Sequence, residues 1–224
     1  MAGDMNENSS RPPKTIWIGF TLMFGVLVLV FAGWLLRVPG HYKSRLLTPI
    51  GPVADFTLTN QNGQVTTLAD LTNHVWVADI IFTRCAGPCP RLTSQMKSLQ
   101  DKLPADSTAK LVTLTTDPDF DSPAVLMKYG ERFGADFKRW TFLTGSKAQI
   151  ASLGADSLKL SAQPVKAEDR KDNADLFIHT TIFVIVDKHC QLRGFFETGG
   201  DGVDWAGDVQ SRILDAVQQL ENEP

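Results

Sequence analysis

Residues 75–90 read VWVADIIFTRCAGPCP, and this stretch decides the fold that we expect. Its first eight residues are almost continuously apolar, as in a central strand that is buried on both faces. Two cysteines, Cys85 and Cys89, follow in a turn that contains Gly87. A helical spacing of apolar residues comes next, at positions 92, 96, 99 and 103. This strand–turn–helix order places both thiols at the carboxyl end of a strand, where α/β sheets carry their sites.

The segments on either side alternate between strand and helix patterns. A hairpin is predicted upstream, for residues 55–68, around the turn Gln61–Gly63. Downstream, the predicted strands are 110–115, 140–143, 181–186 and 192–196, and helices begin near 121, 146 and 209. Residues 161–178 are polar and are predicted to form an irregular excursion. The order indicates an α/β fold with parallel crossovers and an antiparallel edge hairpin.

Composition narrows the class of protein. The chain has 224 residues and a formal net charge of -3. No cluster of Lys and Arg suggests a nucleic-acid surface, so we expect no nucleic-acid partner. Three cysteines are too few for a disulfide framework. Two cysteines close together, with a third left over, indicate a functional site and not a disulfide framework.

Residues 16–36 read IWIGFTLMFGVLVLVFAGWLL and carry no charge. The run matches the roughly 20 residues that a helix needs to cross the hydrocarbon core, and Trp17 and Trp34 lie near its ends. We therefore predict one transmembrane helix. A cleaved signal peptide is the alternative, although the run is long for one and lacks a clear A-x-A cleavage site. The basic residues on the two sides do not decide the orientation.

This segment divides the chain into four predicted parts. They are a polar N-terminal tail at 1–15, the transmembrane helix at 16–36, a Pro- and Gly-containing tether at 37–52 and one globular domain at 53–224. A domain of this length can bury a core without disulfides.

The cysteine pair offers two kinds of chemistry. Cys85 and Cys89 are four residues apart at a helix start, so both sulfurs can face one side. They would serve as two soft metal ligands or as a dithiol/disulfide couple. The positive partial charge of a helix N-terminus predicts a lowered thiol pKa. Two buried structural cysteines are the alternative interpretation.

A third ligand is available late in the sequence. His179 directly precedes the predicted strand 180–186, which we expect to lie beside the cysteine-bearing strand. Two sulfurs and one nitrogen suit copper, whereas zinc would need a fourth ligand that the sequence does not show. A hydrogen-bonded loop histidine is the alternative, and it is also what we expect of His41 and His74. Cys190 is left out of the site.

Three blocks stand in order along the chain: FTRCAGPCP at 82–90, LTTDPDFDSPAVLMKYGERFGADFKRWTFLTG at 114–145 and HTTIFVIVD at 179–187. Together they resemble the Sco/SenC family of copper proteins, which serve cytochrome c oxidase assembly. The resemblance covers roughly residues 53–220. It implies a thioredoxin-like three-layer fold with a central mixed sheet, behind the N-terminal transmembrane helix.

The resemblance also implies one copper ion, as Cu(I) or Cu(II), held by Cys85, Cys89 and His179. Asp117 matches an acidic residue near the family's site, and we predict that it acts through contacts with the ligands. A role in a turn or cap is the alternative. Residues 86–87 are Ala and Gly, where many members have Pro and Asp. This departure from the family pattern bears on which partner protein the chain serves.

Asp79 is an acid within the apolar strand, six residues before Cys85. Thioredoxin-like reductases carry a buried acid at this spacing, where it assists proton transfer. A residue that forms hydrogen bonds at a sheet edge is the favoured alternative.

The leading hypothesis is a membrane-anchored copper metallochaperone, not a classical enzyme. It would deliver copper to the copper-site subunit of a respiratory cytochrome c oxidase or to another copper protein. The alternative is a thiol-disulfide oxidoreductase, in which Cys85 and Cys89 keep an acceptor's cysteines reduced. Either role fits a single-pass protein of the inner membrane whose C-terminal domain faces the periplasm, because disulfide chemistry is rare in the cytosol.

Overall fold

The computed structural model describes residues 23–28, 47–160, 163–164, 177–178 and 181–224. The chain divides into two compact units, Met1–Arg45 and Leu46–Pro224. Of the first unit, residues 23–28 are described, and they are helical with exposed side chains. They fall within the predicted transmembrane segment 16–36, whose other residues lie outside the described part. Among the described residues, no helix combines the length and the hydropathy that crossing a membrane requires.

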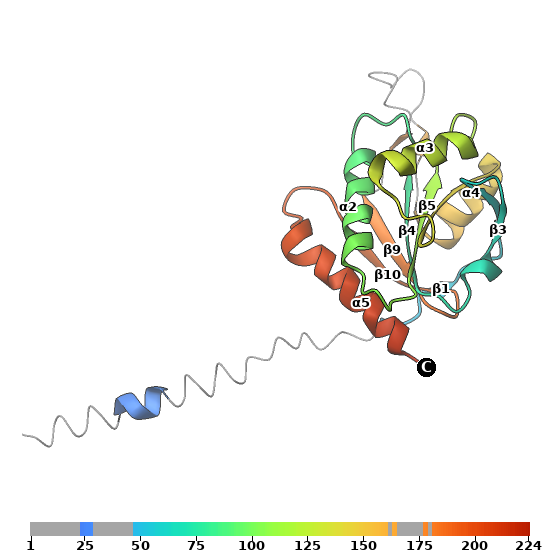
Figure 1. Cartoon of the computed structure of the whole chain (residues 1–224). Coiled ribbons are helices and arrows are strands. Elements are labelled where there is room, and N and C mark those ends of the chain that lie inside the picture. Colours follow the sequence, from blue (N-terminus) through green and yellow to red (C-terminus); the bar gives the residue numbers. More distant parts are fainter. Residues whose placement is uncertain (1–22, 29–46, 161–162, 165–176, 179–180) are drawn as a thin grey trace, which may run out of the picture. The chain divides into compact units, whose positions relative to one another are not determined.

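The second unit is built around a mixed sheet, which has eight strands in the described residues, in the order β1-β10-β9-β4-β5-β6-β2-β3 (Figure 1). β4, β5 and β6 are parallel, while β9 pairs antiparallel with β4 and β2 pairs antiparallel with β6. The strands are β1 (Gly51–Pro52), β2 (Thr57–Asn60), β3 (Val65–Thr67), β4 (Trp76–Ile81), β5 (Lys110–Thr115), β6 (Trp140–Thr144), β9 (Ile182–Val186) and β10 (Gln191–Glu197).

β4 is the central strand that the sequence predicted. It is paired on both sides, with β9 and β5, and all six of its residues are buried. Its side chains alternate between the two faces, so that Val77 and Ile81 belong to one core cluster and Trp76 and Ala78 to the other.

Helices cover both faces of the sheet and give the predicted three layers (Figure 1). One face packs against α2 (Cys89–Lys102), α3 (Pro123–Phe133) and α5 (Gln210–Asn222), which η4 (Trp205–Val209) precedes. The other face packs against η1 (Leu68–Leu71), α4 (Lys147–Ala151) and η2 (Ser152–Ser157).

Local signals in the sequence place several helix ends. Pro123 begins α3, and Gly134 follows its last residue with a left-handed φ of 73°. The predicted capping box opens α4, where Ser146 Oγ accepts from the N–H of Gln149 at 3.3 Å. In return, Gln149 Oε1 accepts from the N–H of Ser146 at 2.9 Å.

The predicted irregular excursion contains a small second sheet. β7 (Gln163–Pro164) pairs antiparallel with β8 (Phe177–Ile178). Strands of two residues are too short to show the period-two pattern that identifies a strand in a sequence. Residues 161–162 and 165–176 lie outside the described part.

Candidate metal centre

The two cysteines lie where β4 leads into α2. β4 ends at Ile81, and the N–H of Cys85 donates to the carbonyl of Phe82 at 3.2 Å. Cys89 is the first residue of α2, and Pro90 occupies the first turn, where a missing N–H has no cost. The predicted strand–turn–helix arrangement is confirmed.

The thiols are buried next to each other. Cys85 is 6% exposed and Cys89 is 1% exposed, and neither forms a disulfide. Their side chains share a hydrogen bond. A Cβ added at Gly87 would lie 3.8 Å from Cys85 Sγ, so the turn passes close over this sulfur. The fold therefore brings the predicted sulfur pair together.

The pKa of the Cys89 thiol is raised, contrary to the lowering that the helix N-terminus predicted. The hydrogen bond with Cys85 is the main cause, and burial adds to it. A thiol that holds its proton against a neighbouring sulfur favours the neutral pair, and this effect outweighs the helix dipole. A metal that binds both sulfurs must therefore displace protons.

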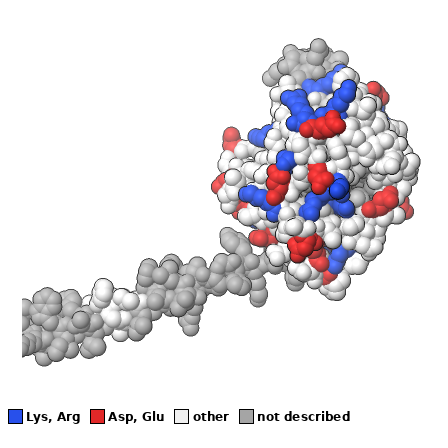
Figure 2. All heavy atoms as spheres, in the orientation of Figure 1, with Lys and Arg blue, Asp and Glu red and all other residues white. Residues whose placement is uncertain are grey.

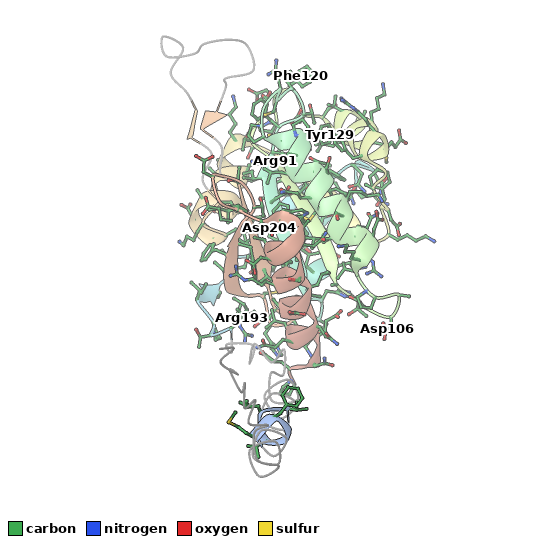
Figure 3. All side chains as sticks on the ribbon, turned by 90° about the vertical axis from the view of Figure 1, so that its left-hand side faces the viewer. Arg91, Asp106, Phe120, Tyr129, Arg193 and Asp204 are labelled. Atoms are coloured by element: carbon green, nitrogen blue, oxygen red, sulfur yellow. The ribbon has the colours of Figure 1, made fainter. Side chains whose placement is uncertain are left out.

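Asp117 contacts the residue that precedes the first cysteine. Its Oδ2 accepts from Arg84 Nη2 at 2.5 Å and from Arg84 Nε at 3.1 Å. The guanidinium also lies 4.2 Å from the ring centroid of Phe120, whose side chain is 45% exposed and is labelled in Figure 3. The sequence interpretation missed both Arg84 and Phe120. They are separated by 36 positions, and no local pattern joins them.

A buried carboxylate fixes the cysteine turn to the end of β5. Asp121 accepts hydrogen bonds from the N–H of Thr83 at 3.1 Å, from the Thr83 hydroxyl and from Thr115 Oγ1 at 2.5 Å. Burial raises the pKa of Asp121, and these hydrogen bonds act against that rise. The sequence predicted only that a helix begins at this residue, so its role beside the site was missed.

The predicted third ligand lies outside the described residues, which omit 179–180. The strand after it is described. β9 lies beside β4, as the sequence predicted, and the two strands pair antiparallel with Ala78 opposite Val184. The start of β9 therefore lies at the same end of the sheet as the cysteine turn. The part of the chain that the structure describes holds no group of three or more His, Cys, Asp or Glu side chains suited to a metal.

Asp79 lies in the middle of the sheet, and the sheet-edge alternative is therefore wrong. It is 0% exposed, and its Oδ1 accepts from Thr113 Oγ1 at 2.6 Å. Trp140 Nε1 donates to the same hydroxyl at 2.9 Å. Asp79 Oδ2 has no partner among the described residues. Burial raises the pKa of Asp79 to about 7, and its charge also contributes to the raised pKa of Cys89.

The remaining candidates lie elsewhere. Nδ1 of His74 is 3.0 Å from the carbonyl oxygen of Thr108, the hydrogen-bonded role that the sequence predicted. Cys190 is buried in the β9–β10 turn, with its sulfur 3.5 Å from Thr72 Oγ1. His41 lies outside the described residues.

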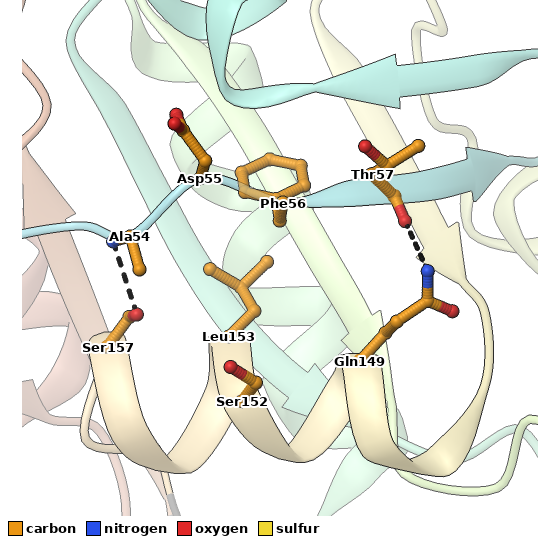
Figure 4. A pocket seen from close by; sticks show the side chains of 8 residues that line it. All are labelled: Ala54, Asp55, Phe56, Thr57, Gln149, Ser152, Leu153 and Ser157. Atoms are coloured by element: carbon orange, nitrogen blue, oxygen red, sulfur yellow. Dashed lines mark hydrogen bonds between the residues drawn. The ribbon is translucent and has the colours of Figure 1, made fainter.

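A small pocket of about 270 Å³ lies between the segment that leads into β2 and the helical turns α4 and η2 (Figure 4). Two hydrogen bonds hold its walls, from the Ala54 N–H to Ser157 Oγ at 3.3 Å and from Gln149 Nε2 to the Thr57 carbonyl at 2.9 Å. Neither cysteine of the pair lines it.

Comparison with known proteins supplies the family. The SCO1/SenC family pattern matches residues 49–214. The SCO1 protein homolog of Bacillus subtilis (strain 168) is 35% identical over 136 residues, which are 60% of this chain and 67% of that protein. The matches span about two thirds of the length of the curated relatives.

Solved structures of the same fold agree. BsSco, a member of the Sco family of cytochrome c oxidase assembly proteins in which a disulfide switch is identified, is 28% identical. It has a TM-score of 0.65 and covers 79% of this chain and 97% of its own. Bradyrhizobium japonicum ScoI with copper bound shares the fold at 21% identity, with a TM-score of 0.57 over 76% of this chain and 99% of its own. Because the family pattern runs from the first edge of the sheet into α5, this chain belongs to the SCO1/SenC family.

Proposed function

We propose that this protein is a copper metallochaperone that holds one copper ion through Cys85, Cys89 and His179. The observation that carries the proposal is the pair of buried thiols, joined by a hydrogen bond, at the carboxyl end of the central strand. Membership of the SCO1/SenC family supports it, and B. japonicum ScoI, which has the same fold, holds copper.

The donor set suits copper as cargo. Two sulfurs and an imidazole nitrogen match the softness of copper, and three ligands leave one side open to a ligand of the acceptor. The position of β9 supports the choice of His179, because the strand that follows it starts beside the cysteine turn. Since the pKa of Cys89 is raised, copper binding should strengthen as the pH rises.

The guanidinium of Arg84, a residue of the cysteine turn, forms an ion pair with Asp117. Asp117 holds that guanidinium through two hydrogen bonds. Through Arg84, Asp117 would help to fix the turn that carries Cys85, which is a less direct role than the contacts with the ligands that the sequence predicted.

The acceptor that we propose is the copper-site subunit of a respiratory cytochrome c oxidase. BsSco belongs to a family of proteins that assemble this enzyme. On the face shown in Figure 2, basic and acidic side chains are intermixed, without the stripe of one sign that nucleic-acid binding favours. A protein partner suits such a surface better than a nucleic acid.

We place the protein in the inner membrane, with residues 16–36 as a single-pass anchor and the domain in the periplasm. The uncharged apolar run supports the anchor. Leu47 is held by Arg193 at the end of the sheet away from the cysteine turn. The chain thus enters the domain opposite the thiols, and a tether keeps them near a membrane-bound acceptor at high effective concentration.

A copper titration of the full-length protein in detergent, with reduced thiols, tests the proposal. The wild-type protein is expected to bind one copper per chain, and Cys85→Ala and Cys89→Ala to lose stoichiometric binding. His179→Ala should keep sulfur-to-copper absorption but lose the nitrogen signature in spin-resonance spectra. His189→Ala is the matched control and should bind normally. Wild-type protein that takes up no copper would contradict the proposal.

A second function is favoured by the sulfur pair itself and by the buried acid beneath it. Cys85 and Cys89 would reduce an acceptor disulfide: one thiolate attacks, the second sulfur resolves the mixed disulfide, and two electrons pass to the acceptor. Asp79 is close enough for its charge to raise the pKa of Cys89. His179→Ala separates the two functions, because dithiol reduction should survive this change undiminished while copper binding should weaken.

A further inference from the structure

The loop after β10 joins the start of β9 to helix α2. On one side, the N–H of Thr198 donates to the Thr181 carbonyl at 2.7 Å, and Thr198 Oγ1 donates to the same oxygen at 2.9 Å. Thr181 Oγ1 donates in turn to the Gly199 carbonyl at 3.2 Å. On the other side, Gln95 of α2 donates from Nε2 to the Thr198 carbonyl at 2.8 Å. We call this set, Gln95, Thr181, Thr198 and Gly199, the brace.

Stability of the fold does not explain why a glutamine occupies position 95. It is 6% exposed on a helix whose other buried side chains are largely apolar. Its Oε1 has no hydrogen-bond partner among the described residues. A buried acceptor without a partner is costly, and an apolar side chain of similar size would avoid that cost. The amide is therefore best explained by what its Nε2 holds.

The backbone of the brace lies against the side chain of Arg91, a residue of α2. A Cβ added at Gly199 would lie 2.0 Å from Arg91 Nη2 and 3.1 Å from Thr181 Cβ. Figure 3 labels Arg91 near the start of α2, two positions after Cys89. A glycine lets the loop lie against the Arg91 guanidinium and against Thr181 together.

We infer that Gln95 is a positioning residue, which sets the histidine-bearing segment against the helix that carries Cys89. This inference rests on the proposed function. Gln95 lies six positions after Cys89 on the same helix, and Thr181 lies two positions after His179. Two Cα steps span at most about 7 Å, so anchoring Thr181 restricts where the imidazole can go. Through the brace, α2 positions the nitrogen ligand as well as a sulfur ligand.

The test compares two glutamines of one helix. Gln95→Met removes the amide at little cost in size or helix propensity. Gln100→Met is the matched control, since Gln100 also donates to a backbone carbonyl, that of Gly134, at 3.3 Å and away from the brace. We expect Gln95→Met to weaken copper binding by about tenfold, as for residues that orient a ligand, and Gln100→Met to leave it unchanged.

The spectra and a double variant show whether Gln95 affects copper binding through His179. In Gln95→Met, sulfur-to-copper absorption should persist while the nitrogen signature in spin resonance weakens. Adding Gln95→Met to His179→Ala should cause no further loss of affinity, because the ligand that it positions is gone. Thr198→Val removes the hydrogen bond from the Thr198 hydroxyl to the Thr181 carbonyl and should repeat the Gln95→Met spectrum. It keeps the test decisive if Gln95→Met fails to fold.

Each outcome has one meaning. If the wild-type protein binds copper, and Gln95→Met and Thr198→Val bind it equally well, the inference is overturned while the proposed function stands. The same follows if these changes weaken binding equally with and without His179. Wild-type protein that binds no copper overturns the proposed function, and the positioning role falls with it.

Discussion

The β9–β10 turn and the β4–α2 turn lie at opposite ends of the sheet, because β9 runs antiparallel to β4. At the β9–β10 end, the buried guanidinium of Arg193 lies 2.5 Å from Asp187 and 2.9 Å from Glu223. Asp187 also accepts two backbone N–H groups at 2.9 Å each. Every charge in this cluster has an opposite charge beside it.

The cysteine side of the molecule holds its ionisable groups differently. Cys89 has a raised pKa beside a second thiol. Asp79 is completely buried with an unpartnered oxygen, and no cation neutralises it among the described residues. Groups held in this way destabilise the fold in their charged form, yet they can change protonation or accept a metal. The difference indicates that one end of the sheet secures the fold and the other carries the chemistry.

Asp79→Asn should give the largest effect, a gain of up to about 4 kcal/mol in the free energy of unfolding at pH 8. The folded-state pKa of Asp79 is about 7 against an ordinary 3.8. Ionisation of Asp79 therefore does not lower the free energy of unfolding of the wild-type protein below pH 4, and it lowers it progressively as the pH rises to about 7. Asn cannot ionise and still accepts from Thr113, so the gain should be near zero at pH 4.

Denaturant unfolding at several pH values measures this gain. Asp106→Asn, at an exposed position, is the control and should show none. An equal gain at pH 4 and pH 8 would mean that Asp79 is not the group that titrates, and the contrast between the two ends would lose its main support.

Arg193→Met should give the next largest effect, a loss of about 3 kcal/mol, because it leaves a buried carboxylate without its cation. We expect copper binding to stay unchanged, since Arg193 lies at the opposite end of the sheet from the cysteines. Arg212→Met removes an exposed ion pair with Asp208 and should cost less than about 1 kcal/mol. Weaker copper binding in Arg193→Met would show that the two ends are coupled.

The sequence predicted the framework of the fold because its signals are local. β5 spans the predicted residues 110–115, and β4 lies within the predicted run 75–82. Apolar runs, a proline at a helix start and a capping box are each read within a few positions. The same locality brought the two cysteines together correctly, since one turn separates them.

The rest of the site depends on contacts between distant residues. Asp121 reaches Thr83 across 38 positions, and Gln95 reaches Thr198 across 103. Neither contact leaves a pattern in the sequence. The direction of the Cys89 pKa was wrong for the same reason, because burial and the partner sulfur outweigh the helix terminus, and both follow from packing.

Phe120→Ala should give the smallest effect, about 0.5 kcal/mol, since an exposed ring stacked on a guanidinium contributes little. Arg84 keeps Asp117 as its partner without the ring. Phe195→Ala is the control, because that ring on β10 is similarly exposed, at 42% against 45%. A loss above about 2 kcal/mol in Phe120→Ala alone would show that the cysteine end also secures the fold. Equal small losses in both variants would show that the ring of Phe120 adds no more to the stability of the cysteine end than an ordinary exposed ring does.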